Sequence, residues 1–138
     1  MSTIVVGYDA SDGSRASLKL AIGLAQELGD TVTVVFGAAP PGILGGEMTS
    51  HEAAVRERGE KVMTEATHQA QGAGFEIETR IVPRHPVEAI LEEAETSKAR
   101  LIVVGNRGGE ATLKGAILGS VPLKLVHISD VPVLVAPA

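Results

Sequence analysis

The stretch LIVVGNRGGEATLKGAILGSV, residues 101–121, joins an apolar run to a loop that contains five glycines. Its first four residues, Leu101–Val104, are apolar without alternation, which is typical of a strand covered on both faces of a parallel sheet. Gly119-Ser120 closes the loop and would open a helix, whose unpaired N–H groups and dipole favour an anion. The loop is therefore either a simple connector or a cradle for phosphate.

The residue types within this loop suit a phosphate. Glycine lets backbone N–H groups approach an anion because no Cβ intervenes. The Ser120 hydroxyl would add a donor, while Arg107 and Lys114 would either offset phosphate charge or remain solvated. No Gly-Lys-Ser/Thr sequence occurs, so the loop is not a Walker P-loop.

Apolar runs and helical stripes alternate along the rest of the chain. We expect strands at Thr3–Tyr8, Thr31–Phe36, Phe75–Val82, Leu101–Val104 and Val131–Val135, with helices between them. The second helix is expected over about His51–Gln71, after a flexible loop at Gly37–Ser50. This order predicts an α/β fold in one domain, residues 1–138, with helices on both faces of a parallel sheet and right-handed crossovers.

Helix ends carry local signals. Ser11 and Ser120 are expected N-caps of the first and last helices. Gly29 would end the first helix, and Pro86 suits the first turn of the third because its missing N–H has no intrahelical partner there.

Strand composition predicts position in the sheet. The first and fourth strands are uniformly apolar and expected inside, whereas Phe75–Val82 alternates and is expected at an edge. Pro132 also places the last strand at an edge, because proline cannot donate to a ladder. Yet Val133–Val135 is wholly apolar, and an exposed apolar edge favours aggregation. We therefore predict a homodimer joined through the C-terminal strand; the alternative is a helix or loop that covers this edge.

If the first and fourth strands are neighbours, the strand order reverses between them, and ligands bind at such a crevice. Asp9 ends the first strand there. Its carboxylate would suit a ribose hydroxyl, an adenine amino group or a magnesium ion that bridges to phosphate. The alternative is that Asp9 caps the following turn by accepting backbone N–H groups.

Composition excludes several classes of function. The net charge of −5, with one Tyr, two Phe and no Trp, argues against a nucleic-acid partner. The chain has no Cys and no closely spaced His pair, which excludes disulfides and argues against a histidine metal site. No apolar run approaches the roughly 18 residues of a membrane span. We expect a cytoplasmic protein.

Several motifs together resemble those of the universal stress protein family. They are Ile4-Val5-Val6-Gly7-Tyr8-Asp9 with Ser11, Pro86 followed by Ile90, Val103-Val104-Gly105-Asn106-Arg107-Gly108, and Gly119-Ser120-Val121 with Pro132-Val133-Leu134-Val135. The resemblance covers the whole chain in order. It implies an open, doubly wound, five-stranded parallel sheet of order 3-2-1-4-5, Rossmann-like and similar to the adenine nucleotide alpha hydrolases. It also implies a homodimer.

ATP-binding members of this family carry Gly-x2-Gly-x9-Gly-Ser/Thr after the fourth strand. The resemblance implies that this loop wraps the phosphates and ribose, that Asp9 lies by the adenosine, and that Gly37 lies near the adenine. The predicted binding residues are Gly7, Tyr8, Asp9, Gly37, Val104, Gly105, Arg107, Gly108, Gly109, Gly119, Ser120 and Val121. The implied ligand is ATP or another adenine nucleotide, with Mg²⁺ held at Asp9 through the nucleotide.

This chain departs from the family pattern in three places. Ten residues separate Gly108 from Gly119 instead of nine. Reading Gly109 as the second glycine restores nine but places three residues instead of two after Gly105, so one residue is extra. Pro122 removes a hydroxyl and an N–H from the expected phosphate side. Pro83-Arg84-His85-Pro86 replaces a segment that in the family often holds a glycine before the proline. Arg84 and His85 either reach the crevice or lie on the surface.

Three functions are weighed. The first is an adenine nucleotide binding protein with a signalling or stress-response role. The second is a nucleotide-free dimeric interaction module, which the extra loop residue and Pro122 favour. The third is a slow ATP hydrolase in which Asp9 or Glu110 orients water, although neither has an adjacent partner that the sequence identifies.

Overall fold

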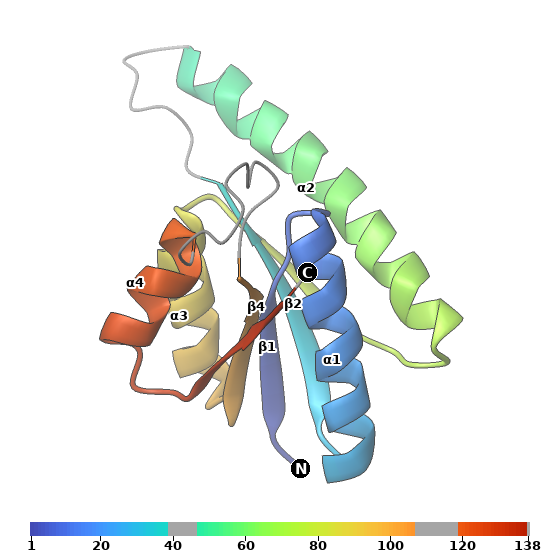
Figure 1. Ribbon diagram of the computed structural model, residues 1–138. Coiled ribbons are helices and arrows are strands. Elements are labelled where there is room, and N and C mark those ends of the chain that lie inside the picture. Colours follow the sequence, from blue (N-terminus) through green and yellow to red (C-terminus); the bar gives the residue numbers. More distant parts are fainter. Residues whose placement is uncertain (39–46, 107–118, 138) are drawn as a thin grey trace.

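The computed structural model describes residues 1–38, 47–106 and 119–137. Strands and helices alternate along the chain, as predicted. In chain order they are β1 (Thr3–Gly7), α1 (Asp12–Leu28), β2 (Thr31–Gly37), α2 (Glu47–Gly72), β3 (Glu78–Val82), α3 (Pro86–Ser97), β4 (Leu101–Gly105), α4 (Ser120–Ile128) and β5 (Val133–Ala136). Helices lie on both sides of the sheet (Figure 1).

The five strands form one parallel sheet in the order β3-β2-β1-β4-β5, which confirms the predicted order. The three middle residues of β1 and of β4 are buried, in agreement with their unbroken apolar runs. β3 and β5 lie at the two edges, as their alternation and proline predicted. The reversal of strand order therefore falls between β1 and β4.

Two hydrophobic clusters separate the helices by face. One holds buried residues of α1 and α2, among them Leu18, Ile22 and Ala66, against β1 and β2. The other holds Ile90 of α3 and Leu125 of α4 on the opposite face. In the described part of the chain, no helix is long and apolar enough to cross a membrane.

Most helix ends follow their predicted signals. The Ser11 Oγ accepts the N–H of Ser14 at 3.2 Å, so Ser11 caps α1. Gly29 ends α1 at a φ of 73°, in the left-handed region where glycine is favoured. Pro86 is the first residue of α3. The prediction of Ser120 as a cap was wrong, because Gly119 occupies that position and Ser120 is helical.

Three other boundaries differ from prediction by more than one residue. The strand expected from Phe75 begins at Glu78, because the Phe75 N–H donates to Ala70 O at the end of α2. The strand expected from Val131 begins at Val133, because the Val131 N–H donates to the hydroxyl of Ser129. α2 begins at Glu47, so residues 47–50 are helical and were wrongly assigned to the loop; residues 39–46 of that loop lie outside the described residues.

A polar clamp holds the amino-terminal end of the sheet, opposite the carboxyl ends of the strands. Asp30 accepts the Ser2 N–H at 2.9 Å and two guanidinium N–H groups of Arg100 at 2.6 and 3.1 Å. The Asp30 side chain is fully buried and that of Arg100 is half exposed. The hydrogen bonds from Arg100, and then that from Ser2, lower the pKa of Asp30 below its usual value.

Candidate nucleotide-binding site

A pocket of about 140 Å³ opens where the strand order reverses. Its walls come from the carboxyl ends of β1, β2 and β4 and from the first turns of three helices. This is the place where open parallel sheets bind their ligands. Eight of the twelve predicted binding residues line it: Gly7, Tyr8, Asp9, Gly37, Val104, Gly105, Ser120 and Val121.

The other four predicted residues have different positions. Gly119 immediately precedes the pocket residue Ser120 and is the N-cap of α4. Arg107, Gly108 and Gly109 lie outside the described residues, as do Lys114 and Glu110.

Seven pocket residues were not among the predicted binding residues: Ser11, Ser14, Val35, Phe36, Pro86, Ile90 and Pro122. Some signals for them were present in the sequence. Ser11 and Pro86 were placed at helix starts, and parallel topology brings those starts to the carboxyl edge of the sheet. Ile90 belonged to the family pattern through its spacing from Pro86 but was assigned to the apolar stripe of its helix. The apolar Val35 and Phe36 offered no such signal, because their types also fit a strand of the core.

Asp9 caps the turn after β1, one of the two alternatives considered, and also lines the pocket. Its Oδ1 accepts the N–H of Ser11 at 3.0 Å, so Asp9 caps the turn that follows β1. The same exposed carboxylate lies on the pocket and is the charged group among the described lining residues. Among those parts of the chain that the structure describes, no cluster of three His, Cys, Asp or Glu side chains could hold a metal ion.

The N-termini of α1 and α4 border the pocket. The N-cap of α4, Gly119, supplies no side chain to bond the first N–H groups of the helix, and Ser120 and Val121 line the pocket. Ser11 and Ser14 in the first turn of α1 line it as well. Because unpaired N–H groups and the helix dipole favour negative charge, this wall suits an anionic group.

The opposite wall is apolar and closely packed. A Cβ placed on Gly37 would lie 2.7 Å from the Ala89 Cβ and 3.0 Å from both Arg84 O and Pro86 Cα. Glycine at the end of β2 therefore lets the start of α3 approach the sheet. Gly37, Pro86 and Ile90 line the pocket together on this side.

Arg84 and His85 lie on the surface, one of the two alternatives considered. The Arg84 guanidinium pairs with Glu92 at 2.6 Å and with Glu88 at 3.3 Å, both on α3. His85 is exposed just before that helix. Neither residue lines the pocket.

The backbone of Asn106 is hydrogen-bonded both to β5 and to the residue that precedes α4. Its N–H donates to Ala136 O at 2.9 Å, and its carbonyl accepts the N–H of Gly119 at 2.8 Å. The first bond ties the end of β4 to β5, and the second ties it to the start of α4. The Asn106 Oδ1 is buried and has no hydrogen-bond partner among the described groups.

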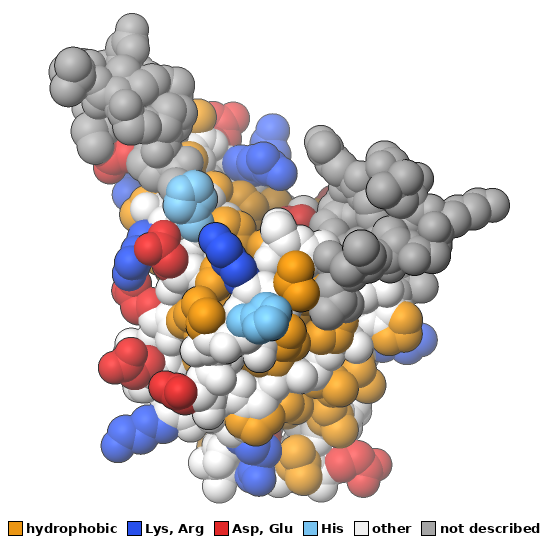
Figure 2. Space-filling view, turned by 60° about the vertical axis from the view of Figure 1, so that its left-hand side comes forward, with side chains coloured by type: hydrophobic (Ala, Val, Ile, Leu, Met, Phe, Trp, Pro, Cys, Tyr) orange, Lys and Arg blue, Asp and Glu red, His pale blue; other side chains and the backbone are white. Residues whose placement is uncertain are grey.

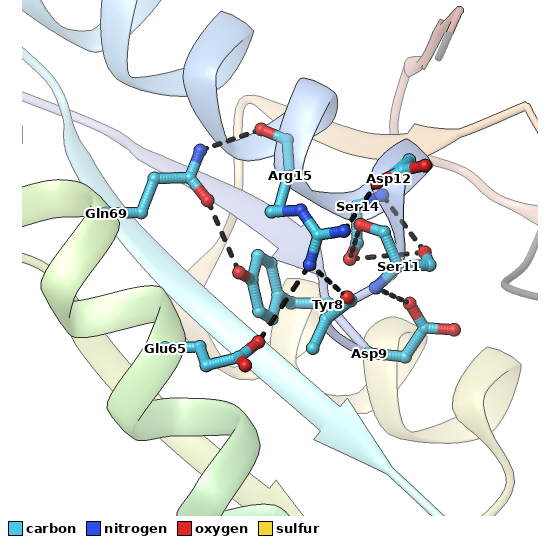
Figure 3. A network of polar contacts seen from close by, with 9 residues as sticks. Tyr8, Asp9, Ser11, Asp12, Ser14, Arg15, Glu65 and Gln69 are labelled. Atoms are coloured by element: carbon cyan, nitrogen blue, oxygen red, sulfur yellow. Dashed lines mark hydrogen bonds and ion pairs between the residues drawn. The ribbon is translucent and has the colours of Figure 1, made fainter.

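A second polar network lies behind the turn that carries Asp9 (Figure 3). The Tyr8 hydroxyl donates to Gln69 Oε1 at 3.3 Å, and Gln69 Nε2 donates to Arg15 O at 2.8 Å. Burial, followed by the neighbouring Glu65 carboxylate, raises the pKa of Tyr8. Tyr8 therefore remains a neutral donor that links β1 to α2.

Fold and pocket together define an α/β protein with a pocket at the switch point of a 3-2-1-4-5 sheet, bordered by helix N-termini. A sequence profile of the Universal stress protein family matches residues 1–137, and the chain belongs to that family. A universal stress protein of Thermus aquaticus is 37% identical over 134 residues, which cover 96% of each chain.

Solved structures agree with this assignment. A universal stress protein crystallised in complex with cAMP has a TM-score of 0.74 and 32% identity, over 99% of this chain and 96% of the other. The universal stress protein from Archaeoglobus fulgidus in complex with dAMP has a TM-score of 0.71 over 99% of this chain and 98% of the other. At 22% identity, the second comparison concerns the fold alone.

Proposed function

We propose that this chain binds an adenine nucleotide in the pocket between β1 and β4, and that it acts as a homodimeric signalling or stress-response protein of the cytoplasm. The observation that carries the proposal is the meeting of two helix N-termini, those of α1 and α4, on one pocket with an apolar recess. The 32% identical relative whose structure contains cAMP supports the same ligand class.

The walls of the pocket suggest how the ligand would lie. The adenine would occupy the recess by Gly37, Pro86 and Ile90, where the lining is apolar. The ribose would lie by Asp9, whose free carboxylate oxygen would accept a hydroxyl. The phosphate would lie on the N–H groups of Ser120 and Val121, beside Gly105 and Gly119. Arg107, Gly108 and Gly109 would complete the phosphate side by their place in the sequence.

The size of the pocket and the charge of Asp9 both limit how a nucleotide would bind. Its volume, about 140 Å³, is below the roughly 300 Å³ of the smallest typical ligand pockets, so part of a nucleotide would extend beyond the described walls. The Asp9 carboxylate would repel a bare triphosphate. We therefore propose that ATP binds with Mg²⁺, which would neutralise phosphate charge near Asp9, whereas AMP or a cyclic monophosphate would need no metal.

Isothermal titration with ATP, ATP plus Mg²⁺, AMP and cAMP tests this function. The Gly119→Val variant should abolish binding, because the isopropyl group would occupy space at the proposed phosphate position. Gly23→Ala is the control, since a Cβ on Gly23 meets nothing within 4 Å. Equal affinity of Gly119→Val and the parent would reject this site, and no binding of any of the four ligands would reject the function.

Two further measurements separate the alternatives. Mass spectrometry of the denatured, purified protein detects adenine nucleotide that has co-purified, which a nucleotide-free interaction module would lack. Phosphate release above that of a heat-killed sample would identify the slow ATP hydrolase. We expect co-purified nucleotide and no release above the control.

The two sheet edges differ in a way that supports the homodimer. β3 carries the exposed, charged Glu78 and Arg80, which protect an edge against pairing. β5 carries no charged residue from Val133 to Ala136. An edge that lacks such protection suits pairing with the same edge of a second copy about a two-fold axis.

The helix beside this edge adds apolar surface. Leu123, Val126 and Ile128 of α4 are 40%, 47% and 57% exposed. Figure 2 turns the α3 and α4 side forward and shows hydrophobic side chains gathered on the right-hand half of that face. Burial of this surface against a second copy would add to the strand pairing.

A further inference from the structure

Ala10 lies between two pocket residues, Asp9 and Ser11, in a backbone conformation that alanine rarely adopts. Its φ is 66°, in the left-handed region, where the Cβ crowds the following carbonyl oxygen. Such a conformation persists only where surrounding contacts maintain it. The turn that presents Asp9 to the pocket is therefore strained at its centre.

Two contacts maintain this turn. The hydrogen bond from the Ser11 N–H to Asp9 Oδ1, 3.0 Å long, spans Ala10 from inside the turn. From α1, the Arg15 Nη1 donates to the carbonyl oxygen of Ala10. Figure 3 shows the guanidinium group of Arg15 facing this turn.

Arg15 makes three further contacts, two through its guanidinium group and one through its carbonyl oxygen. Its Nη2 donates to Asp12 Oδ1 at 2.5 Å, and its Nη1 lies 3.9 Å from Glu65 Oε2 on α2. The Arg15 carbonyl accepts the Gln69 Nε2–H at 2.8 Å. A planar guanidinium can bond Ala10 and Asp12 at once, which a lysine ammonium on a flexible stem cannot reproduce with the same geometry.

We propose that Arg15 is a positioning residue for the nucleotide site, and this rests on the function proposed above. By holding the Ala10 carbonyl, Arg15 keeps the turn from Asp9 to Ser11 in the conformation that receives the ligand. Without that bond only the Ser11–Asp9 contact maintains the turn, and a larger fraction of molecules has Ala10 in the conformations that alanine prefers. The apparent affinity then falls in proportion to the fraction of molecules whose turn is competent.

The first test compares variants at two arginines by titration with whichever of ATP, ATP plus Mg²⁺, AMP and cAMP binds the parent most tightly. Arg15→Ala should weaken binding roughly fivefold or more, because left-handed alanine is then no longer stabilised. Arg80→Ala is the matched control: both side chains are 45% exposed and paired with acids, but Arg80 lies on β3. Arg15→Lys preserves the charge and should also weaken binding, which separates the geometric role from simple attraction of phosphate.

The second test is a rescue. Glycine adopts positive φ without penalty, so Ala10→Gly in the Arg15→Ala background should restore the affinity of the parent. Ala10→Gly alone measures the effect of glycine by itself, and the recovery is judged against that single variant. If Arg15 served only to stabilise the fold, Arg15→Ala would lower the melting temperature, and adding Ala10→Gly would not restore the affinity. If Arg15→Ala does not fold, Arg15→Lys with and without Ala10→Gly provides the same comparison.

The outcomes are distinct. Parent-like affinity of Arg15→Ala, or of Arg15→Lys where Arg15→Ala does not fold, overturns the role of Arg15 while the nucleotide site stands. A loss that Ala10→Gly does not recover overturns it too. A parent protein that binds none of the four nucleotides overturns the proposed function, and the role of Arg15 with it.

Discussion

Gly105 at the end of β4 packs directly on the backbone of Gly13 in the first turn of α1. A Cβ on Gly105 would lie 2.7 Å from the Gly13 carbonyl carbon and 2.8 Å from its Cα and oxygen. These backbone atoms cannot move aside as the end of a flexible side chain would. Glycine at position 105 therefore has a structural reason that is independent of any ligand.

Gly105→Ala should destabilise the protein by roughly 1–3 kcal/mol, the range for overpacking a close contact. Urea unfolding followed by circular dichroism measures the change. Gly23→Ala provides the comparison, because Gly23 is exposed on α1 with open space around it and alanine favours a helix. A variant at position 105 as stable as the parent would show that α1 and β4 separate easily.

Asp9→Asn should change how nucleotide binding depends on Mg²⁺. The amide oxygen can still accept the Ser11 N–H, so the turn is preserved while the negative charge is lost. Metal-free ATP should bind more tightly by roughly 1 kcal/mol, or about fivefold, since one charge repulsion is removed. Binding of Mg²⁺–ATP should weaken. Titration calorimetry measures both, and Asp130→Asn, at an exposed position after α4, is the control. An unchanged Mg²⁺ dependence would place the metal away from Asp9.

Asp30→Asn should lower the melting temperature at pH 7 by several degrees. Arg100 and the Ser2 N–H lower the folded-state pKa of Asp30, so its contribution to stability is complete above the unfolded-state pKa of about 3.9. That contribution is lost as pH falls through the lower, folded-state pKa. The difference in melting temperature between parent and variant should therefore narrow below about pH 4. A constant difference from pH 7 to pH 2 would contradict this.

Val135→Pro should convert the proposed dimer to a monomer. Pro132 O and Ala136 O accept N–H groups from the β4 side, and backbone groups alternate along a strand, so the Val135 N–H points to the free edge. Proline at 135 removes that donor without removing a bond to β4. Light scattering after gel filtration measures the mass, and Val135→Thr keeps the N–H and the branched shape. A dimeric Val135→Pro variant would move the interface away from β5.

The sequence predicted those features of the fold that depend on local chemistry. The unbroken apolar runs of β1 and β4 matched their interior positions, and Pro132 matched an edge. Predicted boundaries were wrong where a backbone N–H makes a different hydrogen bond, as at Phe75, whose N–H donates to Ala70 O at the end of α2. The cap of α4 was misplaced by one residue because Pro122 is tolerated throughout the first turn, where its missing N–H has no partner.

The pocket was predictable mainly through residues of unusual type. Glycines, Asp9 and Ser120 were recognised because each suits contact with an anion or a sugar. The apolar wall was not, because Val35 and Ile90 read as ordinary core residues and their exposure to the pocket depends on how the layers pack. The positive φ of Ala10 could not be predicted either, because alanine rarely adopts that conformation.

The bond between Asn106 and Gly119 has a consequence for engineering. The Gly119 N–H donates to the Asn106 carbonyl oxygen at 2.8 Å, and the Asn106 N–H donates separately to Ala136 O. The two residues that flank positions 107–118 are therefore bonded directly to each other. The entropy of closing a loop rises only slowly with its length. Variants that differ in the number and kind of residues between Asn106 and Gly119 should therefore retain the fold, which makes this part of the sequence suitable for changing the specificity of the proposed nucleotide site.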